Sequence, residues 1–367
     1  MGHRVLHLST PLTIFHLAKL LDESPRERLR LWSSGGIERH GDLIEYVPLS
    51  MIPWQIARHA MPARNLFLAC IPNLRRKLAS LGFQHADLLL IDQPKMQGLE
   101  GMVSAGAVVY RATDLYPEIT GDPLVALAEE MLVRKADLVV GTSQPVLNHL
   151  RTLGNPRREL LLENGVDVAH FSTPRPAPSE YEGIAGPIAV YAGALDERFD
   201  LDLIKYLCAK LPSLRVMLIG PVSTEARRVV EGIPNATLLG PRRFEVLPAF
   251  LQHARIGLLP LSAHPANAGR SPMKLYEYGA SGLPIVSSWT PALAHSEKPF
   301  VELAKTPEDF VQTVKAILAD KVRYEFMRRS GLEAAQRMNW DGIAERLLSE
   351  VHSLLDLSNG CNGQERN

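Results

Sequence analysis

Cysteine is scarce in this sequence of 367 residues, which contains Cys70, Cys208 and Cys361, far apart in the chain. An odd and widely spaced set predicts neither a disulfide framework nor a zinc site, and it suits a reducing cytosol. The chain also lacks a run of about 18 apolar residues, so no segment predicts a membrane-spanning helix. The apolar run at the amino terminus is too short for a signal peptide. We therefore expect a cytoplasmic protein, either soluble or peripheral on the inner face of the cell membrane.

Charge of one sign is not in excess either. Lys and Arg together number 40, as do Asp and Glu. This balance argues against a general electrostatic affinity for nucleic acid. Apolar residues make up 46% and charged residues 22%, which is typical of globular proteins with well-packed cores. The length predicts two domains of ordinary size.

Short apolar runs alternate with longer helical patterns, which is typical of an α/β protein. Most of the runs are continuous rather than alternating, as in parallel strands covered on both faces. The predicted strands are 5–9, 28–33, 88–92, 108–111, 138–142 and 160–163 in the first half, and 188–192, 215–219, 236–239, 256–259 and 285–288 in the second.

The domain organisation follows from one segment in which apolar residues have neither helical nor strand spacing. Residues 173–187 are rich in Pro and Gly, and they predict a linker between an N-terminal domain, 1–172, and a C-terminal domain, 188–339. A helical pattern at 340–357 predicts a helix that crosses back onto the first domain. The polar residues 358–367 are expected to form a disordered tail.

The most informative segment begins at Ser271 and combines a turn, a helix and a buried strand. Ser271 predicts a helix cap, and Pro272 is tolerated in a first helical turn. Lys274 and Glu277 are three residues apart on one face near the amino end of that helix. An anion is favoured there, so we expect Lys274 to meet a phosphate and Glu277 to accept hydrogen bonds from ribose hydroxyls. The alternative is an ordinary ion pair on the surface of a helix.

Polar residues that directly follow predicted strands mark the edge where open α/β sheets bind ligands. Asp114 follows one such strand and is a candidate general base for a hydroxyl, or else a cap for the next helix. Gly193 follows another strand and would let backbone amides approach a diphosphate, which Arg198 would partly neutralise. Residues 164–167, Asn-Gly-Val-Asp, predict a loop that closes the first domain and helps to shape the cleft.

Several motifs, in this order and over essentially the whole chain, resemble those of GT-B glycosyltransferases. They are Tyr110-Arg-Ala-Thr-Asp114, Glu163-Asn-Gly-Val-Asp167, Gly193, Leu259-Pro-Leu261, Ser271-Pro-Met-Lys-Leu-Tyr-Glu277 and Gly282-Leu-Pro284. Within this fold the chain resembles the bacterial exopolysaccharide glucuronosyltransferases of the xanthan type, family 70. It is also similar to the retaining family 4, which includes proteins of teichuronic acid synthesis. The resemblance implies two Rossmann-like, doubly wound domains that face each other across a cleft.

The resemblance also implies roles for single residues. The C-terminal domain would hold a nucleotide sugar, and the N-terminal domain would receive the acceptor. Asp114 matches the catalytic base of the inverting glucuronosyltransferase. Ser271, Met273 and Lys274 lie in the segment that matches its donor-binding Ser-Met-Lys.

Two further positions bear on the mechanism. Glu277 matches the ribose-binding acid of family 4, where the glucuronosyltransferase has an amide. Family 4 usually carries a second glutamate eight positions earlier, and Gly269 stands there in this chain. This departure favours inversion over retention.

The predicted function is transfer of a sugar, with glucuronic acid as one candidate, from a UDP sugar to a lipid-linked or polysaccharide acceptor in bacterial cell-surface polysaccharide synthesis. Asp114 would take the proton of the acceptor hydroxyl while Lys274 and Arg198 stabilise the leaving diphosphate. No cofactor is expected besides the nucleotide-sugar co-substrate, and no paired-aspartate motif is placed to hold a metal. The alternatives are a retaining family 4-type enzyme and a catalytically silent GT-B binding protein.

The first domain also suggests where the acceptor is found. Residues 46–86 contain no Asp or Glu, and their cations are Arg58, Arg64, Arg75, Arg76 and Lys77, interleaved with apolar residues. Such a segment predicts peripheral contact with an anionic membrane, and therefore a lipid-linked saccharide as acceptor. The alternative is a pair of ordinary domain helices with solvated arginines.

Overall fold

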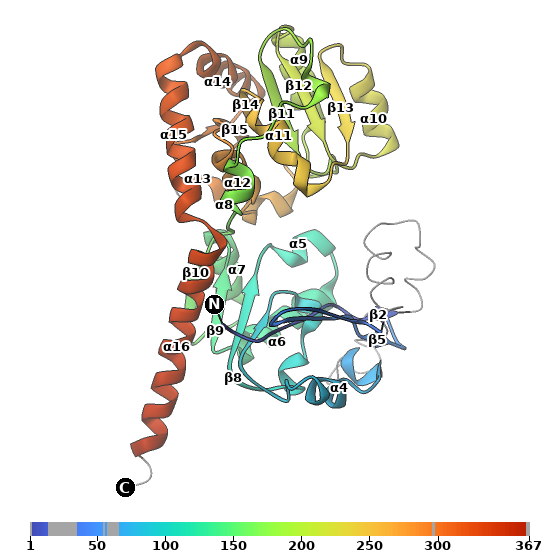
Figure 1. Cartoon of the computed structure of the whole chain (residues 1–367), viewed down its shortest axis with the longest axis vertical. Helices are drawn as coiled ribbons and strands as arrows, with labels where there is room; N and C mark the ends of the chain where they lie inside the picture. Colours follow the sequence, from blue (N-terminus) through green and yellow to red (C-terminus); the bar gives the residue numbers. More distant parts are fainter. Residues whose placement is uncertain (1, 14–34, 54–55, 57–65, 296–297, 365–367) are drawn as a thin grey trace.

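The structure is a computed structural model of the chain, and it describes every residue except 1, 14–34, 54–55, 57–65, 296–297 and 365–367. Buried apolar side chains form two groups of cores. One group holds residues 46–162 and part of the last helix, and the other holds residues 166–338. We call these parts the N-terminal half and the C-terminal half, which lie one below the other in Figure 1.

The C-terminal half is built on a six-stranded parallel sheet of order β13-β12-β11-β14-β15-β16. The strands are β11 (Ile188–Ala192), β12 (Arg215–Ile219), β13 (Ala236–Gly240), β14 (Ile256–Leu259), β15 (Ile285–Ser288) and β16 (Val301–Ala304). This is the doubly wound order 3-2-1-4-5-6. The chain therefore leaves β11 and β14 toward opposite sides, which opens a crevice beyond their carboxyl ends.

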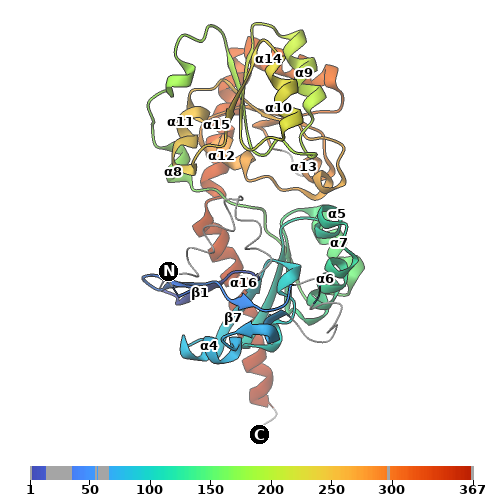
Figure 2. The ribbon, with the colours of Figure 1, turned by 90° about the vertical axis from the view of Figure 1, so that its right-hand side faces the viewer.

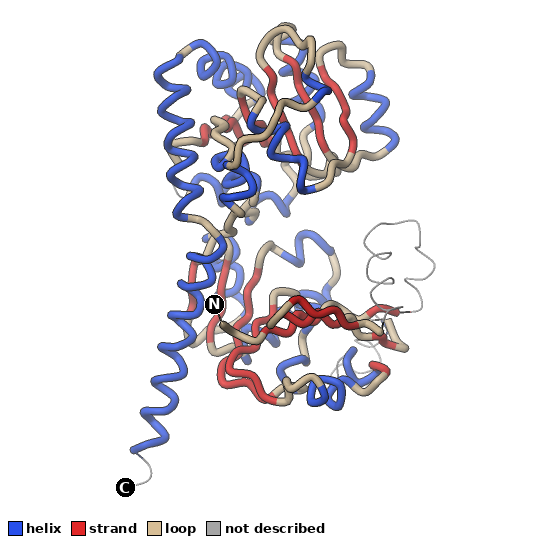
Figure 3. Tube along the Cα trace, in the orientation of Figure 1, coloured by secondary structure: helices blue, strands red, loops and turns tan. Residues whose placement is uncertain are grey.

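Helices cover this sheet on both faces, as Figure 3 shows. They are α8 (Val168–Ser172), α9 (Leu201–Lys210), α10 (Thr224–Glu231), α11 (Leu247–Gln252), α12 (Lys274–Ala280), α13 (Pro291–Ala294), α14 (Pro307–Ala319) and α15 (Lys321–Arg337). Because both faces are covered, β11 and β14 are buried along their whole length, as continuous apolar runs predict.

The N-terminal half has a parallel sheet of order β10-β9-β8-β7 and two small three-stranded sheets. The strands of the larger sheet are β7 (His85–Ile91), β8 (Ser104–Ala112), β9 (Leu138–Gly141) and β10 (Glu159–Leu161). The small sheets are formed by β1 (Val5–Leu8), β4 (Leu43–Tyr46) and β3 (Ile37–His40), and by β2 (Leu12–Thr13), β5 (Leu49–Ser50) and β6 (Cys70–Ile71). The helices are α4 (Leu74–Ser80), α5 (Tyr116–Thr120), α6 (Pro123–Lys135) and α7 (Gln144–Leu153).

The predicted α/β class is confirmed, and four strands of the C-terminal half have the predicted bounds. The predicted strand 28–33 lies outside the described residues. The hairpin of β3 and β4 differs from a purely parallel arrangement, since its strands pair antiparallel. Only Gly41 and Asp42 connect them, and a two-residue connection joins antiparallel strands alone. Gly41 has a φ of +61°, which favours glycine in so tight a turn.

The last helix, α16 (Trp340–Gln364), returns to the N-terminal half, as predicted. Its side chains Ile343, Leu347 and Val351 pack in one core with residues of β8 and β9. Figures 1 and 2 show it running the length of that half. The helix also continues past residue 357, so residues 358–364 are helical and not a disordered tail. Once the packed part has nucleated the helix, each further residue adds a hydrogen bond at little entropic cost.

The first domain boundary also differs from the prediction. Phe171 is 1% exposed and lies in the core of the C-terminal half, together with Val166 and Tyr181. Residues 166–172 therefore belong to the second core, because the large apolar ring of Phe171 finds its partners there. The segment predicted as a linker, 173–187, contains only a short 3₁₀ turn at Ser179–Tyr181.

Candidate functional site

The crevice at the carboxyl ends of β11 and β14 receives loops from both halves. Gly193 to Arg198 follow β11, and a longer segment that includes the 3₁₀ turn Pro265–Gly269 follows β14. From the N-terminal half, α5 packs against that turn. Figure 2 shows α5 and α7 at the edge of the N-terminal half that faces α13. Residues that follow β11, β14 and β8 are thus brought together.

Asp114 lies at this junction, just after β8. Burial raises the pKa of its carboxyl group, and the Arg270 guanidinium opposes that rise most strongly, followed by the Thr113 hydroxyl and Arg198. The Thr113 Oγ1 lies 3.4 Å from Asp114 Oδ2. Two cations of the C-terminal half therefore face this carboxylate. The alternative role as a helix cap is not observed, because α5 is preceded by Leu115 and has no side-chain cap.

Lys274, the first residue of α12, lies in the same crevice. Burial, followed by the nearby Arg270, lowers the pKa of its ammonium group to about 8, while Glu277 acts in the opposite direction. The Lys274 Nζ lies 5.9 Å from the centre of the Tyr191 ring. A lysine in a cluster of cations is costly to keep charged, and a bound anion would remove that cost.

Gly193 lies directly beside this lysine. A Cβ at position 193 would lie 2.5 Å from Lys274 Cε and 2.8 Å from the Tyr191 hydroxyl. The Gly193 N–H donates to the carbonyl of Ile219 at 2.7 Å, so this amide is already engaged. The N–H of Gly193 itself is therefore not open to a ligand, and the predicted approach of neighbouring backbone amides to a diphosphate stays a prediction. The missing side chain makes room for Lys274.

The two arginines of the crevice differ in their partners. Arg198 pairs with Asp196, and its Nε lies 3.1 Å from Asp196 Oδ1. Arg270 is half-buried, and its guanidinium makes no hydrogen bond or ion pair with the residues that the structure describes. It acts electrostatically on Asp114, Lys274 and Asp196. Arg270 therefore carries a charge that no group in the described part of the chain neutralises by direct contact.

The start of α12 differs from the prediction for Ser271. The helix begins at Lys274 after Met273, and no side chain caps it, so Ser271 is not the cap. Met273 is 49% exposed. Burial raises the pKa of Glu277, and Lys274 and His170 oppose that shift. The expected pairing of Lys274 and Glu277 on one helical face is thus present, in a half-buried rather than an open setting.

A second polar cluster, next to Arg270, joins the two halves. Glu163 accepts a hydrogen bond from the Tyr276 hydroxyl and lies 3.2 Å from Lys298 Nζ. The space among Glu163, Arg270, Lys298 and their neighbours amounts to only about 10 Å³, so the halves are closely packed here. Sequence reasoning missed Lys298, because it lies in a loop without a motif.

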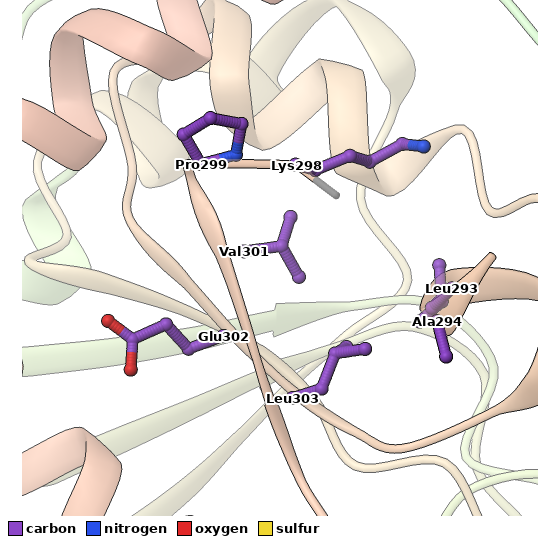
Figure 4. A pocket seen from close by; sticks show the side chains of 7 residues that line it. All are labelled: Leu293, Ala294, Lys298, Pro299, Val301, Glu302 and Leu303. Carbon is purple, nitrogen blue, oxygen red and sulfur yellow. The ribbon is translucent and has the colours of Figure 1, made fainter. Parts of the chain in front are cut away.

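A larger cavity of about 380 Å³ lies beside the edge strand β16. Figure 4 shows its lining, which is mostly apolar and includes Leu293, Val301 and Leu303, with Lys298 at one side. None of the predicted site residues lines this cavity. Its size therefore does not make it the site of the predicted chemistry.

Among the described residues, one group has the proximity of metal ligands: Glu38, His40 and Glu45, on β3 and β4. It belongs to the antiparallel hairpin and contains none of the crevice residues. Within the described part of the chain, moreover, no helix has the length and apolarity needed to cross a membrane.

Comparison with known proteins agrees with this geometry. Residues 186–320, which hold Gly193, Arg198 and Lys274, match the family model described as "Glycosyl transferases group 1". This part of the chain is a glycosyl transferase group 1 domain. The matched residues include the strands β11 to β16 of the doubly wound sheet.

A curated relative extends the similarity into the rest of the chain. TuaH of Bacillus subtilis (strain 168), provisionally named a teichuronic acid biosynthesis glycosyltransferase, is 25% identical over 272 residues, 68% of each protein. This chain is thus homologous to a protein named as a glycosyltransferase.

Solved structures establish the fold of the whole chain. Sucrose-phosphate synthase of Thermosynechococcus elongatus superposes with a TM-score of 0.70 and 18% identity, over 88% of this chain and 86% of that one. HepE of Anabaena, solved with UDP and glucose, superposes with a TM-score of 0.66 and 16% identity, over 95% and 99%. The predicted GT-B architecture is confirmed.

Proposed function

We propose that this protein transfers a sugar from a UDP sugar to a lipid-linked or polysaccharide acceptor in the synthesis of a bacterial cell-surface polysaccharide. One observation carries the proposal: the carboxylate of Asp114 faces Arg270 and Arg198 across the junction of the two halves, and Lys274 lies near these arginines. Similarity to TuaH and to HepE, which was solved with UDP and with UDP-glucose, supports the substrate classes.

The cations suit a diphosphate. A UDP sugar carries two negative charges on its diphosphate, and a third develops as the sugar departs. Arg270 has no ion-pair partner among the described residues. Lys274 lies near Arg270, and this cation helps to lower the pKa of the Lys274 ammonium group. A diphosphate would pair with both groups. These side chains would then stabilise the leaving group without a metal ion.

Asp114 suits the acceptor side of the reaction. It follows β8 of the N-terminal half and lies opposite the cations, so a sugar bound between them would have the carboxylate on one side and the diphosphate on the other. As general base, Asp114 would take the proton of the acceptor hydroxyl during its attack on the anomeric carbon. This arrangement favours inversion.

Gly269 supports the same stereochemical outcome. A Cβ at this position would lie 2.5 Å from Leu115 Cγ. The place where family 4 usually has a glutamate is thus filled by a side chain of the other half. We propose Glu277 as the ribose-binding acid, Ser271 and Met273 as donor contacts, and Arg270 or Arg198 as the partner of a uronate if the donor is UDP-glucuronate.

We also propose peripheral contact with an anionic membrane through the region around β5 and β6. Met51, Leu68 and Ile71 are 48–58% exposed there, and Arg75 and Arg76 lie on the adjoining α4. Lys77 also lies on α4, whereas Arg58 and Arg64 of the predicted segment lie outside the described residues. Co-flotation with anionic vesicles at low salt tests this contact, and absence of the protein from the vesicle fraction would remove it.

The donor is tested by thermal unfolding with UDP, GDP, ADP and a panel of UDP sugars that includes UDP-glucuronate. A ligand at about 100 times its dissociation constant stabilises the native state by about 2.7 kcal/mol. We expect UDP to raise the melting temperature and one UDP sugar to raise it further. If no nucleotide shifts the unfolding transition, the proposed function is wrong. If UDP binds but no UDP sugar is consumed with any acceptor, the chain is a binding protein.

A further inference from the structure

The backbone on either side of Arg270 is held by residues outside the C-terminal half. The buried Ser143 hydroxyl donates to the carbonyl of Gly269 at 2.7 Å. The Asn164 side-chain amide donates to the carbonyl of Ser271 at 2.8 Å. Arg270 is therefore bracketed by a hydrogen bond from the N-terminal half and one from the segment that connects the two halves, where Asn164 lies.

A third contact lies at Gly269 itself. A Cβ there would lie 2.5 Å from Leu115 Cγ and 3.3 Å from Val146 Cγ2. Gly269 is not in the left-handed region of φ, so backbone conformation does not require glycine. What requires it is the approach of Leu115, the residue directly after Asp114.

The residues that make these contacts are anchored in the N-terminal half. Ser143 caps α7 by accepting the N–H of Val146 at 3.3 Å. The Arg111 guanidinium of β8 donates to Asn164 Oδ1 at 2.7 Å, which fixes the orientation of that amide. The elements that carry Asp114 thus also hold the residues next to Arg270.

The groups that hold Arg270 carry no charge. Ser143, Asn164 and Leu115 fix its position without neutralising its guanidinium, although Lys274 lies nearby and repels it. Such a device keeps the positive charge free for an anionic ligand. An ion pair in the same place would have competed with that ligand.

We propose that Leu115, Ser143 and Asn164 are positioning residues that place Arg270 against the donor diphosphate only when the two halves are docked. This inference rests on the proposed function, because it takes a nucleoside diphosphate as the ligand of Arg270. It goes beyond the proposed function because it gives the N-terminal half a share in donor affinity. That share comes from three uncharged contacts. Separation of the halves would withdraw the cation from the diphosphate.

The test is a mutant cycle read out as UDP affinity by titration calorimetry. Arg270→Ala is expected to weaken UDP binding about tenfold, as the loss of a charged hydrogen bond implies. Gly269→Ala, which forces Leu115 away, is expected to weaken it as much. The double variant R270A/G269A should be no weaker than either single one, because both changes remove the same interaction. Adding Leu115→Ala to Gly269→Ala should restore most of the affinity, since the space for the new methyl group is returned.

Gly232→Ala is the matched control, because a Cβ at position 232 meets its nearest neighbour at an ordinary 3.4 Å and lies away from the crevice. It should leave UDP affinity unchanged. If Gly269→Ala unfolds, Asn164→Ala replaces it in the cycle, with a weaker effect expected.

The two hypotheses fail differently. If the native protein does not bind UDP, the proposed function fails and this inference with it. If the native protein binds UDP but Gly269→Ala binds equally well, or if the losses of Arg270→Ala and Gly269→Ala multiply, the positioning role is wrong and the proposed function stands.

Discussion

Lys274 makes UDP binding depend on pH in a direction that the structure determines. Burial and the neighbouring Arg270 and Arg198 depress its pKa to about 8 from an ordinary value of 10.5. The free protein therefore loses this charge as the pH rises through 8. A diphosphate binds the protonated form better and keeps it protonated, so affinity should fall with rising pH.

The size of the effect follows from the pKa. With a value near 8, the protonated fraction falls about 25-fold between pH 7.5 and 9.5, which corresponds to about 1.9 kcal/mol of binding free energy. Two neighbouring groups have pKa values that shift away from this window. Burial raises the pKa of Tyr191 to about 12, and Arg198 holds the pKa of Asp196 below its usual range against the effect of burial. The terminal phosphate of UDP is already ionised above pH 7.5.

Titration calorimetry at pH 7.5, 8.5 and 9.5 measures this dependence, and two buffers of different ionisation enthalpy reveal the proton taken up on binding. Lys274→Arg is the matched control, since a guanidinium stays charged throughout and should give a flat profile. Lys274→Met should bind UDP weakly at every pH. Equal affinity of the native protein at both ends of the range, or an equal slope for Lys274→Arg, would refute the role of Lys274.

Three further predictions concern the base, the ribose site and the last helix. Asp114→Asn should slow transfer about 10²–10⁴-fold without weakening UDP binding, as kinetics beside calorimetry will show; a collapse of UDP affinity would instead make Asp114 a donor-site residue. Glu277→Ala should weaken UDP binding about tenfold through lost hydrogen bonds, measured by calorimetry, and an unchanged affinity would contradict that role. Ile343→Ala should destabilise the native state by about 2–5 kcal/mol in denaturant unfolding, whereas the exposed Glu345→Ala should cost little, and equal costs would contradict the packing of α16 on β8.

The sheet of the C-terminal half could be predicted almost completely. Strands such as 188–192 and 256–259 are short continuous apolar runs, because both of their faces are covered. The types of neighbouring residues therefore suffice to predict their burial. The edge strand β16 was missed, since Val301–Ala304 has Glu302 in its middle, and this glutamate forms an ion pair with Arg323 on α15. An ion-pair partner that is distant in the sequence cannot be recognised from the pattern of neighbouring residues.

The sequence singled out candidate residues for the site but not their arrangement. Asp114, Lys274 and Glu277 stand out because they follow strands or open a helix, and the crevice does receive them. The contact between Gly193 and Lys274 was not predicted, since a glycine after a strand does not tell whether a ligand or a lysine lies beside it. The predicted cap Ser271 was displaced by a helix that begins three residues later.

The sequence by itself determined the α/β class, the doubly wound C-terminal sheet and the candidate residues for the site, because each depends on burial patterns and turns within a few neighbouring residues. Only the tertiary structure decided that Arg270 has no ion-pair partner within the described part of the chain, that Leu115 fills the space above Gly269, and that Ser143 and Asn164 bracket Arg270. These contacts join residues more than 100 positions apart, and their geometry is set by the docking of two cores rather than by any local preference of the chain.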